Sequence, residues 1–230
     1  KGVIPSLENV KEKGLRALSP AELEVIVESE GALVLDTRGA QTFKDGFVPR
    51  SINIGLKGDF APWVGSMIPD VKHPLVLVCD EGAEDEVVTR LARVGYDHVF
   101  GYLKGGISAW KASGKEVDTL ESISAAEFAH RMNGGKLTVF DVRKQGEWDA
   151  EHLESARFAS LQFINEHLAE FSKTEPNYIH CQGGYRSMIA ASILKARGYH
   201  NVIDVAGGFG AIKKTDLATT DFVCPSTLKK

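Results

Sequence analysis

The sequence predicts an α/β protein built from two tandem copies of one unit, each a parallel β-sheet flanked by helices. Two observations lead to this fold class: a repeat on the scale of a domain, and an alternation of short apolar strands with helices inside each copy. The repeat is visible where Leu35-Asp36-Thr37-Arg38 recurs as Phe140-Asp141-Val142-Arg143, and where Gly105-Gly106 recurs as Gly207-Gly208.

Both copies follow the same order of elements. Each begins with a Ser-x-x-Glu capping box, in which the two side chains satisfy free backbone N–H groups at the start of a helix; these are Ser19 with Glu22 and Ser124 with Glu127. Apolar segments then predict three strands per copy, at residues 32–35, 75–78 and 99–103 and at residues 137–140, 178–180 and 202–205. Helices are predicted at 85–94 and 188–197, each ended by a glycine.

Composition and charge narrow the class of protein. The formal net charge of −4 gives no basic footprint for nucleic acid, and no apolar run approaches the ~18 residues of a membrane span. Three widely spaced cysteines form neither a disulfide framework nor a zinc ligand pattern. We therefore expect a cytoplasmic protein without nucleic-acid or membrane partners.

The repeat and the polar stretches between its copies set the expected domain boundaries. The first domain is placed at 15–114 and the second at 123–218, joined by a polar linker at 115–122. Residues 1–14 match neither copy and are expected to be an N-terminal extension or the tail of an upstream domain, because the chain begins with Lys1 rather than Met. Residues 219–230 are expected to be a C-terminal tail.

The segment after the second strand of copy two carries the predicted chemistry. A strand ends at Cys181, a Gly-rich loop follows with Arg186, and a helix is expected to begin near Ser187. Backbone N–H groups in such a loop point at one centre, and the helix N-terminus and Arg186 add positive charge. These surroundings stabilise a thiolate, a persulfide or a bound oxyanion, so the pattern indicates that Cys181 is a nucleophile.

These motifs resemble the rhodanese family over most of the chain. In copy two the resemblance rests on Asp141-Val142-Arg143, the loop 181–186 and Gly207-Gly208-Phe209. In copy one it rests on Asp36-Thr37-Arg38 and on Lys104-Gly105-Gly106-Ile107-Ser108-Ala109-Trp110. The resemblance implies two tandem rhodanese-like domains, each a five-stranded parallel sheet flanked by helices.

The same resemblance implies a thiosulfate sulfurtransferase-like enzyme. It would move a sulfane sulfur from a donor such as thiosulfate or a persulfide to a thiophilic acceptor, such as cyanide or a thiol, and would need no metal or organic cofactor. Cys181 would carry the persulfide, Arg186 would bind the anionic donor, and Asp141 with Arg143 would brace the loop by an ion pair. Substrate binding would fall to the loop that follows the cysteine: Gln182, Gly183, Gly184, Tyr185 and Ser187.

Two other functions stay open. Tandem rhodanese domains of this style resemble the C-terminal part of proteins with an upstream metallo-β-lactamase-fold domain, so the pair could be a persulfide-relay or interaction module for such a hydrolase or dioxygenase. A phosphatase or arsenate reductase is the weaker alternative, because four residues separate Cys181 from Arg186 where those relatives use five. His180 is expected to end the strand, with a role in tuning the thiolate left open.

The first copy is expected to be inactive. Counting back from Gly95, as from Gly198 to Cys181, reaches Val78, with Cys79 one residue later. The loop that follows is acidic at five of the seven positions 80–86 and contains no Arg or Lys. Carboxylates raise the pKa of a neighbouring thiol and repel anionic donors, so Cys79 is interpreted as structural. Cys224 is interpreted as a free exposed thiol.

Overall fold

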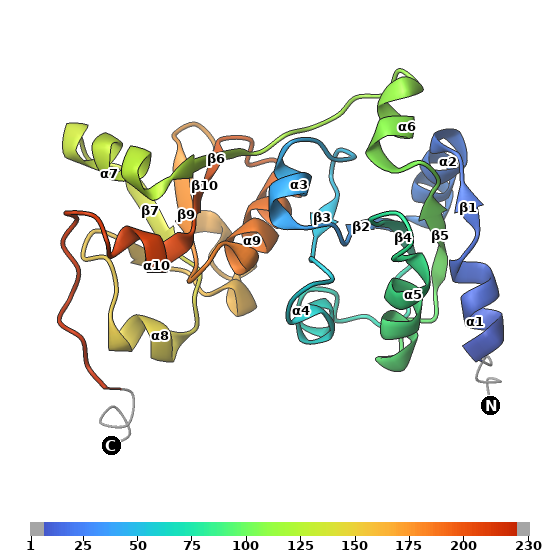
Figure 1. Ribbon diagram of the computed structural model, residues 1–230, viewed down its shortest axis with the longest axis horizontal. Coiled ribbons are helices and arrows are strands. Elements are labelled where there is room, and N and C mark those ends of the chain that lie inside the picture. Colours follow the sequence, from blue (N-terminus) through green and yellow to red (C-terminus); the bar gives the residue numbers. More distant parts are fainter. Residues whose placement is uncertain (1–6, 225–230) are drawn as a thin grey trace. The chain divides into compact units, whose positions relative to one another are not determined.

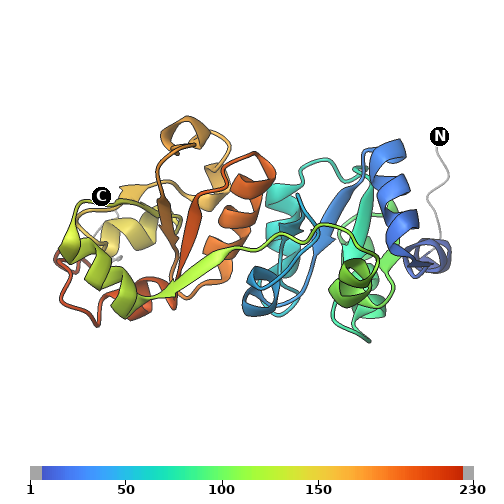
Figure 2. The same ribbon diagram turned by 90° about the horizontal axis from the view of Figure 1, so that it is seen from above.

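The protein is described here by a computed structural model that covers residues 7–224. The chain divides into two compact units, one ending at Thr119 and the next beginning at Leu120 (Figure 1). The extended segment between the last helix of the first unit and the first strand of the second connects them (Figure 2). Within residues 7–224, no helix combines the length and apolar character that a membrane crossing requires.

The first unit is a five-stranded parallel sheet with strand order β1-β5-β4-β2-β3, and helices lie against it. Its strands are β1 (Ala17–Leu18), β2 (Leu33–Asp36), β3 (Ile52–Asn53), β4 (Leu75–Val78) and β5 (Val99–Leu103). Its helices are α1 (Leu7–Gly14), α2 (Pro20–Glu30), α3 (Ala40–Lys44), α4 (Phe60–Met67), α5 (Glu84–Arg93) and α6 (Gly106–Ala112).

The second unit repeats this arrangement with strand order β6-β10-β9-β7-β8, again all parallel. Its strands are β6 (Glu121–Ser124), β7 (Thr138–Asp141), β8 (Arg157–Phe158), β9 (Asn177–His180) and β10 (Val202–Ala206). Its α-helices are α7 (Ala125–Gly134), α8 (Gln145–Ala150), α9 (Tyr185–Ala196) and α10 (Gly208–Ile212), with two short 3₁₀ helices at Leu161–Phe163 and Leu168–Glu170. The predicted fold class is therefore confirmed.

Burial on both faces explains why the central strands consist of apolar residues. All four residues of β4 are buried, as are all four of β9, since helices cover both faces of a parallel sheet. In the second unit, residues of β7, β9 and β10 pack with α7 into one core that includes Phe128, Val139, Tyr178 and Val205. This core fixes the strand ends from which the loops of the site emerge.

The first helix of each repeat begins as its sequence predicts. The Ser19 hydroxyl accepts a hydrogen bond from the backbone of Glu22, and the Glu22 carboxylate accepts one from the backbone of Ser19, which completes the capping box. At the second site, Ser124 accepts from the backbone of Glu127 in the same way. Such a cap satisfies N–H groups that the helix itself leaves unpaired.

Several boundaries differ from the expected ones. Helix α9 begins at Tyr185 rather than near Ser187, because Gly184 adopts a left-handed conformation (φ 106°) that ends the loop earlier. The edge strands β1, β3 and β8 have two residues each, which is too short for any hydrophobic period to appear in the sequence. Strand β6 begins inside the segment that was expected to be a linker.

The two ends of the chain make contacts that the sequence did not suggest. Helix α1 packs against α5 and β5 of the first unit, with Val10 buried and Lys11 paired with Asp85 at 2.6 Å. The segment after Ala218 runs along the loop that follows α8 (Figure 1): Thr220 donates its backbone N–H to His152, and Val223 donates to Ala150. Residues 225–230 of the expected tail lie outside the described residues.

Candidate active site

Cys181 lies at the carboxyl end of β9, the central strand of the second sheet. Loops at this edge of a parallel sheet are the usual place for ligands. The loop from Cys181 to Gly184 is short, and α9 follows it immediately, so the cysteine lies at the N-terminal end of a long helix. The Cys181 side chain is buried, with only 1% of its surface exposed, whereas Gln182 and Gly183 are exposed.

The sulfur of Cys181 has two polar neighbours, one that donates a hydrogen bond to it and one that accepts from it. The backbone N–H of Gly184 donates a hydrogen bond to Sγ at 3.1 Å, and the Ser187 hydroxyl oxygen lies 3.6 Å from Sγ. Both groups belong to the loop and the first turn of α9, where the free N–H groups of the helix favour anions. One of these contacts, the Gly184 N–H, is of the kind that a thiolate needs.

A chain of polar side chains continues behind Ser187. Its hydroxyl donates to Oδ1 of Asp204 at 2.7 Å, and Ser122 donates to Oδ2 of the same carboxylate at 2.7 Å. Asp204 is buried in β10, next to β6, which carries Ser122. This carboxylate was not predicted as a site residue, although a charged residue between Ile203 and Val205 in an apolar strand was a usable signal.

Arg186, the predicted donor-binding residue, forms a two-pronged ion pair with Glu147 of α8. Its Nη1 and Nη2 atoms lie 2.5 and 2.8 Å from the two carboxylate oxygens. These hydrogen bonds raise the pKa of the Arg186 guanidinium. Burial opposes ionisation of Glu147, but the hydrogen bonds from Arg186 and from the backbone of Lys144 outweigh it and hold the pKa of Glu147 below its ordinary value.

The ion pair of Asp141 and Arg143 forms as predicted. Nε and Nη2 of Arg143 bind the carboxylate at 2.7–3.0 Å, and both side chains are buried. The same guanidinium donates to Oε1 of Gln182 at 3.2 Å and to the backbone carbonyl of Glu151 at 2.8 Å. It also lies 4.1 Å from the ring centroid of Phe209. Arg143 therefore links β7, the loop after Cys181 and the end of α8.

The Gly207-Gly208-Phe209 motif fastens the loop from the other side. Phe209 donates its backbone N–H to the carbonyl of Cys181 at 2.6 Å, and Gly210 donates to the carbonyl of Gln182 at 3.1 Å. Gly208 has φ 54°, and a Cβ atom added there would lie 2.3 Å from the carbonyl oxygen of Cys181. Only a glycine lets α10 approach the loop this closely.

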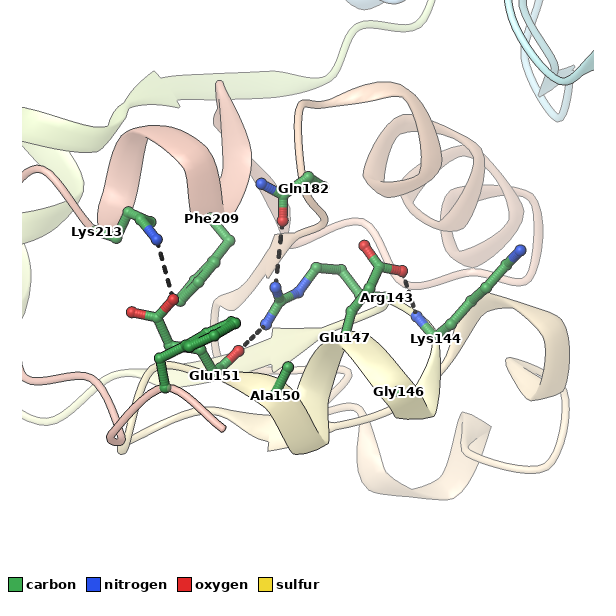
Figure 3. A pocket seen from close by; sticks show the side chains of 10 residues that line it. Arg143, Lys144, Gly146, Glu147, Ala150, Glu151, Gln182, Phe209 and Lys213 are labelled. Carbon is green, nitrogen blue, oxygen red and sulfur yellow. Dashed lines mark hydrogen bonds and ion pairs between the residues drawn. The ribbon is translucent and has the colours of Figure 1, made fainter. Parts of the chain in front are cut away.

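A cavity of about 490 Å³ opens beside the loop. Figure 3 shows Arg143 at its centre, between Gln182 above and the end of α8 below, with Phe209 and Lys213 reaching in from α10. Lys213 pairs with the Glu151 carboxylate at 3.0 Å. The remaining wall is formed by Lys144, Gly146, Glu147, Ala150 and Phe222, so the C-terminal segment contributes to the cavity.

His180 is buried directly before the nucleophile. Its Nδ1 lies 3.3 Å from the carbonyl oxygen of Cys181, and its Nε2 lies 4.0 Å from Asp141, without a hydrogen-bond partner among the described residues. Burial lowers the pKa of the imidazole, although the Asp141 charge opposes the shift. Burial therefore favours the neutral ring, whose nitrogen atoms contact the Cys181 carbonyl and approach Asp141 rather than Sγ.

We expect His180 to make the protein less stable in acid. Because its pKa is lowered on folding, its contribution is present above the unfolded pKa of ~6.5 and is lost as the pH falls below it, by up to about 1.4 kcal/mol per pH unit. The drop in urea midpoint between about pH 7.5 and about pH 5.5 should be smaller in His180→Gln than in wild type. The exposed His98 provides a control: His98→Gln should keep the wild-type drop, and equal drops in both variants would contradict the assignment.

In the first unit, the structure corrects the sequence alignment of the residue equivalent to Cys181. Val78 pairs with Asp36 as His180 pairs with Asp141, so the next residue, Cys79, is the true counterpart of Cys181. The count from Gly95 missed this by one residue. Burial, followed by the nearby charges of Glu84, Asp36 and Asp80, raises the pKa of Cys79 to about 12, although a hydrogen bond with Thr37 opposes the shift.

Tyr185 begins α9 and is partly buried, while Cys224 is exposed as expected. In the described part of the chain, no three His, Cys, Asp or Glu side chains come together as metal ligands. Glu147, Asp204 and Phe209 are the site residues that were missed or given no role.

The doubled α/β fold and the cysteine at a helix N-terminus define a class of proteins with a candidate cysteine nucleophile. The chain matches the Rhodanese-like domain family over residues 19–113 and 124–215, and it belongs to that family. Both copies are covered, in agreement with the expected tandem repeat. The link to a metallo-β-lactamase-fold partner is not tested by these matches.

Individual relatives are similar over shorter stretches. YrkF of Bacillus subtilis, provisionally named a sulfur carrier protein, is 25% identical over 127 residues, which are 55% of this chain and 61% of YrkF. MoeZ of Mycobacterium tuberculosis, provisionally named an adenylyltransferase/sulfurtransferase, is 32% identical over 84 residues, 36% of this chain and 21% of MoeZ. The chain thus spans less than two thirds of either relative.

Among solved structures, a rhodanese-like domain protein from Staphylococcus aureus is 29% identical to this chain, with a TM-score of 0.40. The match includes 43% of this chain and 97% of the Staphylococcus aureus chain. Together, the family and the relatives support a role in sulfur transfer.

Proposed function

We propose that the second unit is a rhodanese-type sulfurtransferase that carries a sulfane sulfur on Cys181. The observation that carries this proposal is the position of Sγ, 3.1 Å from the Gly184 amide at the start of α9. A persulfide places its negative charge on the outer sulfur, and a loop of backbone N–H groups at a helix N-terminus stabilises such a charge without needing a metal.

The reaction has two balanced half-steps. The Cys181 thiolate attacks the outer sulfur of thiosulfate; a new S–S bond forms, the S–S bond of the donor breaks, and its electron pair leaves with sulfite. An acceptor such as cyanide then attacks the outer sulfur of the Cys181 persulfide, and the thiolate of Cys181 is released together with thiocyanate. The Gly184 amide donates a hydrogen bond to Sγ and supports negative charge on the sulfur, whereas the Ser187 hydroxyl donates its proton to Asp204.

Asp141 and Arg143 act as positioning residues in this scheme. Their ion pair holds the side chain of Gln182 and the end of α8, while the backbone of Phe209 holds the Cys181 carbonyl. The loop is thus fixed from two sides before any donor arrives, which reduces the reorganisation that the reaction requires.

The first test is mass spectrometry of the wild-type protein after incubation with thiosulfate or with an organic persulfide. We expect a gain of one sulfur atom on the peptide that contains Cys181, and its removal by cyanide. Absence of this gain with both donors would contradict the proposed function. A gain on the Cys79 or Cys224 peptide instead would assign the chemistry to another cysteine.

A persulfide relay is the second candidate. It is favoured by the relative named as a sulfur carrier, since a carrier passes sulfur between proteins rather than to free cyanide. In this form the donor would be a protein-bound or small-molecule persulfide, and an upstream metallo-β-lactamase-fold domain in the native chain would be the partner. A phosphatase or arsenate reductase is disfavoured, because the loop is one residue shorter and Arg186 is already bound by Glu147.

A further inference from the structure

Arg186, in the first turn of α9, is the first cation after Cys181 in the sequence, and both of its terminal nitrogens are bound by Glu147. Each terminal nitrogen of the guanidinium contacts a different carboxylate oxygen, in the geometry that makes arginine–carboxylate pairs strong and directional. The pair is only partly exposed, with 16% of the Arg186 and 32% of the Glu147 side chain accessible, so solvent screens it incompletely.

The ion pair with Glu147 neutralises the charge of Arg186 and so weakens the attraction of the site for anionic sulfur donors. The second nearby arginine, Arg143, is paired with Asp141, so each of the two guanidinium groups has a carboxylate partner of its own. A dianion such as thiosulfate must either displace Glu147 from Arg186 or bind close to the Glu147 charge. A persulfide with an uncharged organic group carries at most one negative charge, so it meets a smaller cost than the dianion.

The first unit supports a link between the two residues. The offset that relates Asp36 to Asp141 relates Thr42 to Glu147, so this unit has no carboxylate at the position of Glu147. It also has an acidic first turn in α5, where α9 has Arg186. The carboxylate and the arginine are thus present together in the copy with the reactive loop and are replaced together in the other.

Glu147 is held in place by more than Arg186. It lies in the first turn of α8, and its carboxylate also accepts a hydrogen bond from the backbone N–H of Lys144 at 3.1 Å. Glu147 also forms part of the wall of the cavity beside the loop (Figure 3). Gln182, the neighbour of Cys181, also lines this cavity, so we place the organic group of the donor there; thiosulfate has no such group.

We propose that Glu147 sets the donor preference of Cys181: by pairing with Arg186 it disfavours dianionic donors and favours the persulfides of small organic thiols. This inference rests on the proposed sulfurtransferase function and names the donor class for the same site. In the transfer, the Cys181 thiolate attacks the outer sulfur of the organic persulfide, the S–S bond of the donor breaks, and the electron pair leaves on the organic thiolate. Glu147 is a specificity-determining residue in this scheme and exchanges no proton or electrons.

The test compares wild type with Glu147→Gln and uses two donors, thiosulfate and the persulfide of 2-mercaptoethanol, whose organic group is uncharged. The rate of persulfide formation on Cys181 is followed by mass spectrometry over a range of donor concentrations. Glu147→Gln should lower the half-saturating thiosulfate concentration by about tenfold, since a charge is removed beside the dianion. It should lower that of the singly charged organic persulfide by about threefold or less.

Asp149→Asn is the matched control. Asp149 lies on α8 two residues after Glu147, is exposed, and contacts Gln145 rather than Arg186, so its replacement removes the same charge without freeing the arginine. It should leave both half-saturating concentrations unchanged. An equal shift in the two variants would show a general charge effect and would overturn the inference.

The outcomes separate this inference from the proposed function. If Glu147→Gln loses rate equally with both donors, Glu147 holds Arg186 for the reaction itself, and the inference is wrong. If it leaves the ratio between the donors unchanged, the inference is also wrong, while the sulfurtransferase function stands. A wild-type protein that takes sulfur from neither donor would instead contradict the proposed function.

Discussion

Replacing Cys181 with Ser should abolish sulfur uptake, leaving less than about one thousandth of the wild-type rate. A hydroxyl in this position is almost fully protonated at neutral pH and cannot form a persulfide. The substitution removes the sulfur that the Gly184 amide contacts, but keeps a small side chain at a buried site, so the fold should be retained. The measurement is thiocyanate formation from cyanide, with far-UV circular dichroism to confirm folding.

Cys79→Ser provides the matched control, because Cys79 occupies the same position at the end of β4. Its raised pKa, about 12, means that the thiol remains protonated at neutral pH and contributes no nucleophile. The variant should therefore keep the wild-type rate. In wild type, Cys79 should react with iodoacetamide only as the pH approaches 12. Loss of thiocyanate formation in Cys79→Ser, or its persistence in Cys181→Ser, would show that the nucleophile is misassigned.

The sequence was sufficient to predict those parts of the structure that depend on nearby residues. Strands β4 and β5 match their predicted bounds, and the brace between Asp141 and Arg143 forms because the two residues are separated by one position at a strand end. The acidic residues after Cys79 act on its pKa as expected, since burial and neighbouring carboxylates both disfavour the thiolate.

Contacts between distant segments could not be predicted in the same way. Glu147 and Arg186 are brought together by the packing of α8 near the start of α9, and nothing in either segment alone identifies the pair. The alignment of Cys79 failed for a related reason. Five residues join β4 to α5 but four join β9 to α9, while α5 has 10 residues and α9 has 12. The count back from the glycine after each helix therefore included a longer connection and a shorter helix in the first unit, and these two differences do not cancel.

Gly208→Ala should be the most damaging substitution outside the cysteine itself, lowering the rate of sulfur uptake by at least about a hundredfold. The new Cβ would lie 2.3 Å from the carbonyl oxygen of Cys181 and 2.8 Å from the carbonyl carbon of Gln182. Both contacts are with backbone atoms, so the loop itself must move, and it would carry Cys181 away from the Gly184 amide. A shift of about 1 Å at a reacting group is enough for a loss of this size.

The first unit again provides the control. Gly106 is the counterpart of Gly208 and has nearly the same backbone conformation, with φ 57° against 54°, but a Cβ added there meets no atom within 4 Å. Gly106→Ala and Gly208→Ala therefore share the cost of placing alanine in the left-handed region, about 1 kcal/mol, and differ only in the collision with the loop. We expect urea unfolding to show this shared cost in both variants, and a further loss of stability in Gly208→Ala alone. Sulfur uptake should stay at the wild-type level in Gly106→Ala. Equal rates in the two variants would mean that the packing of the Cys181 loop against α10 does not control the reactivity of Cys181.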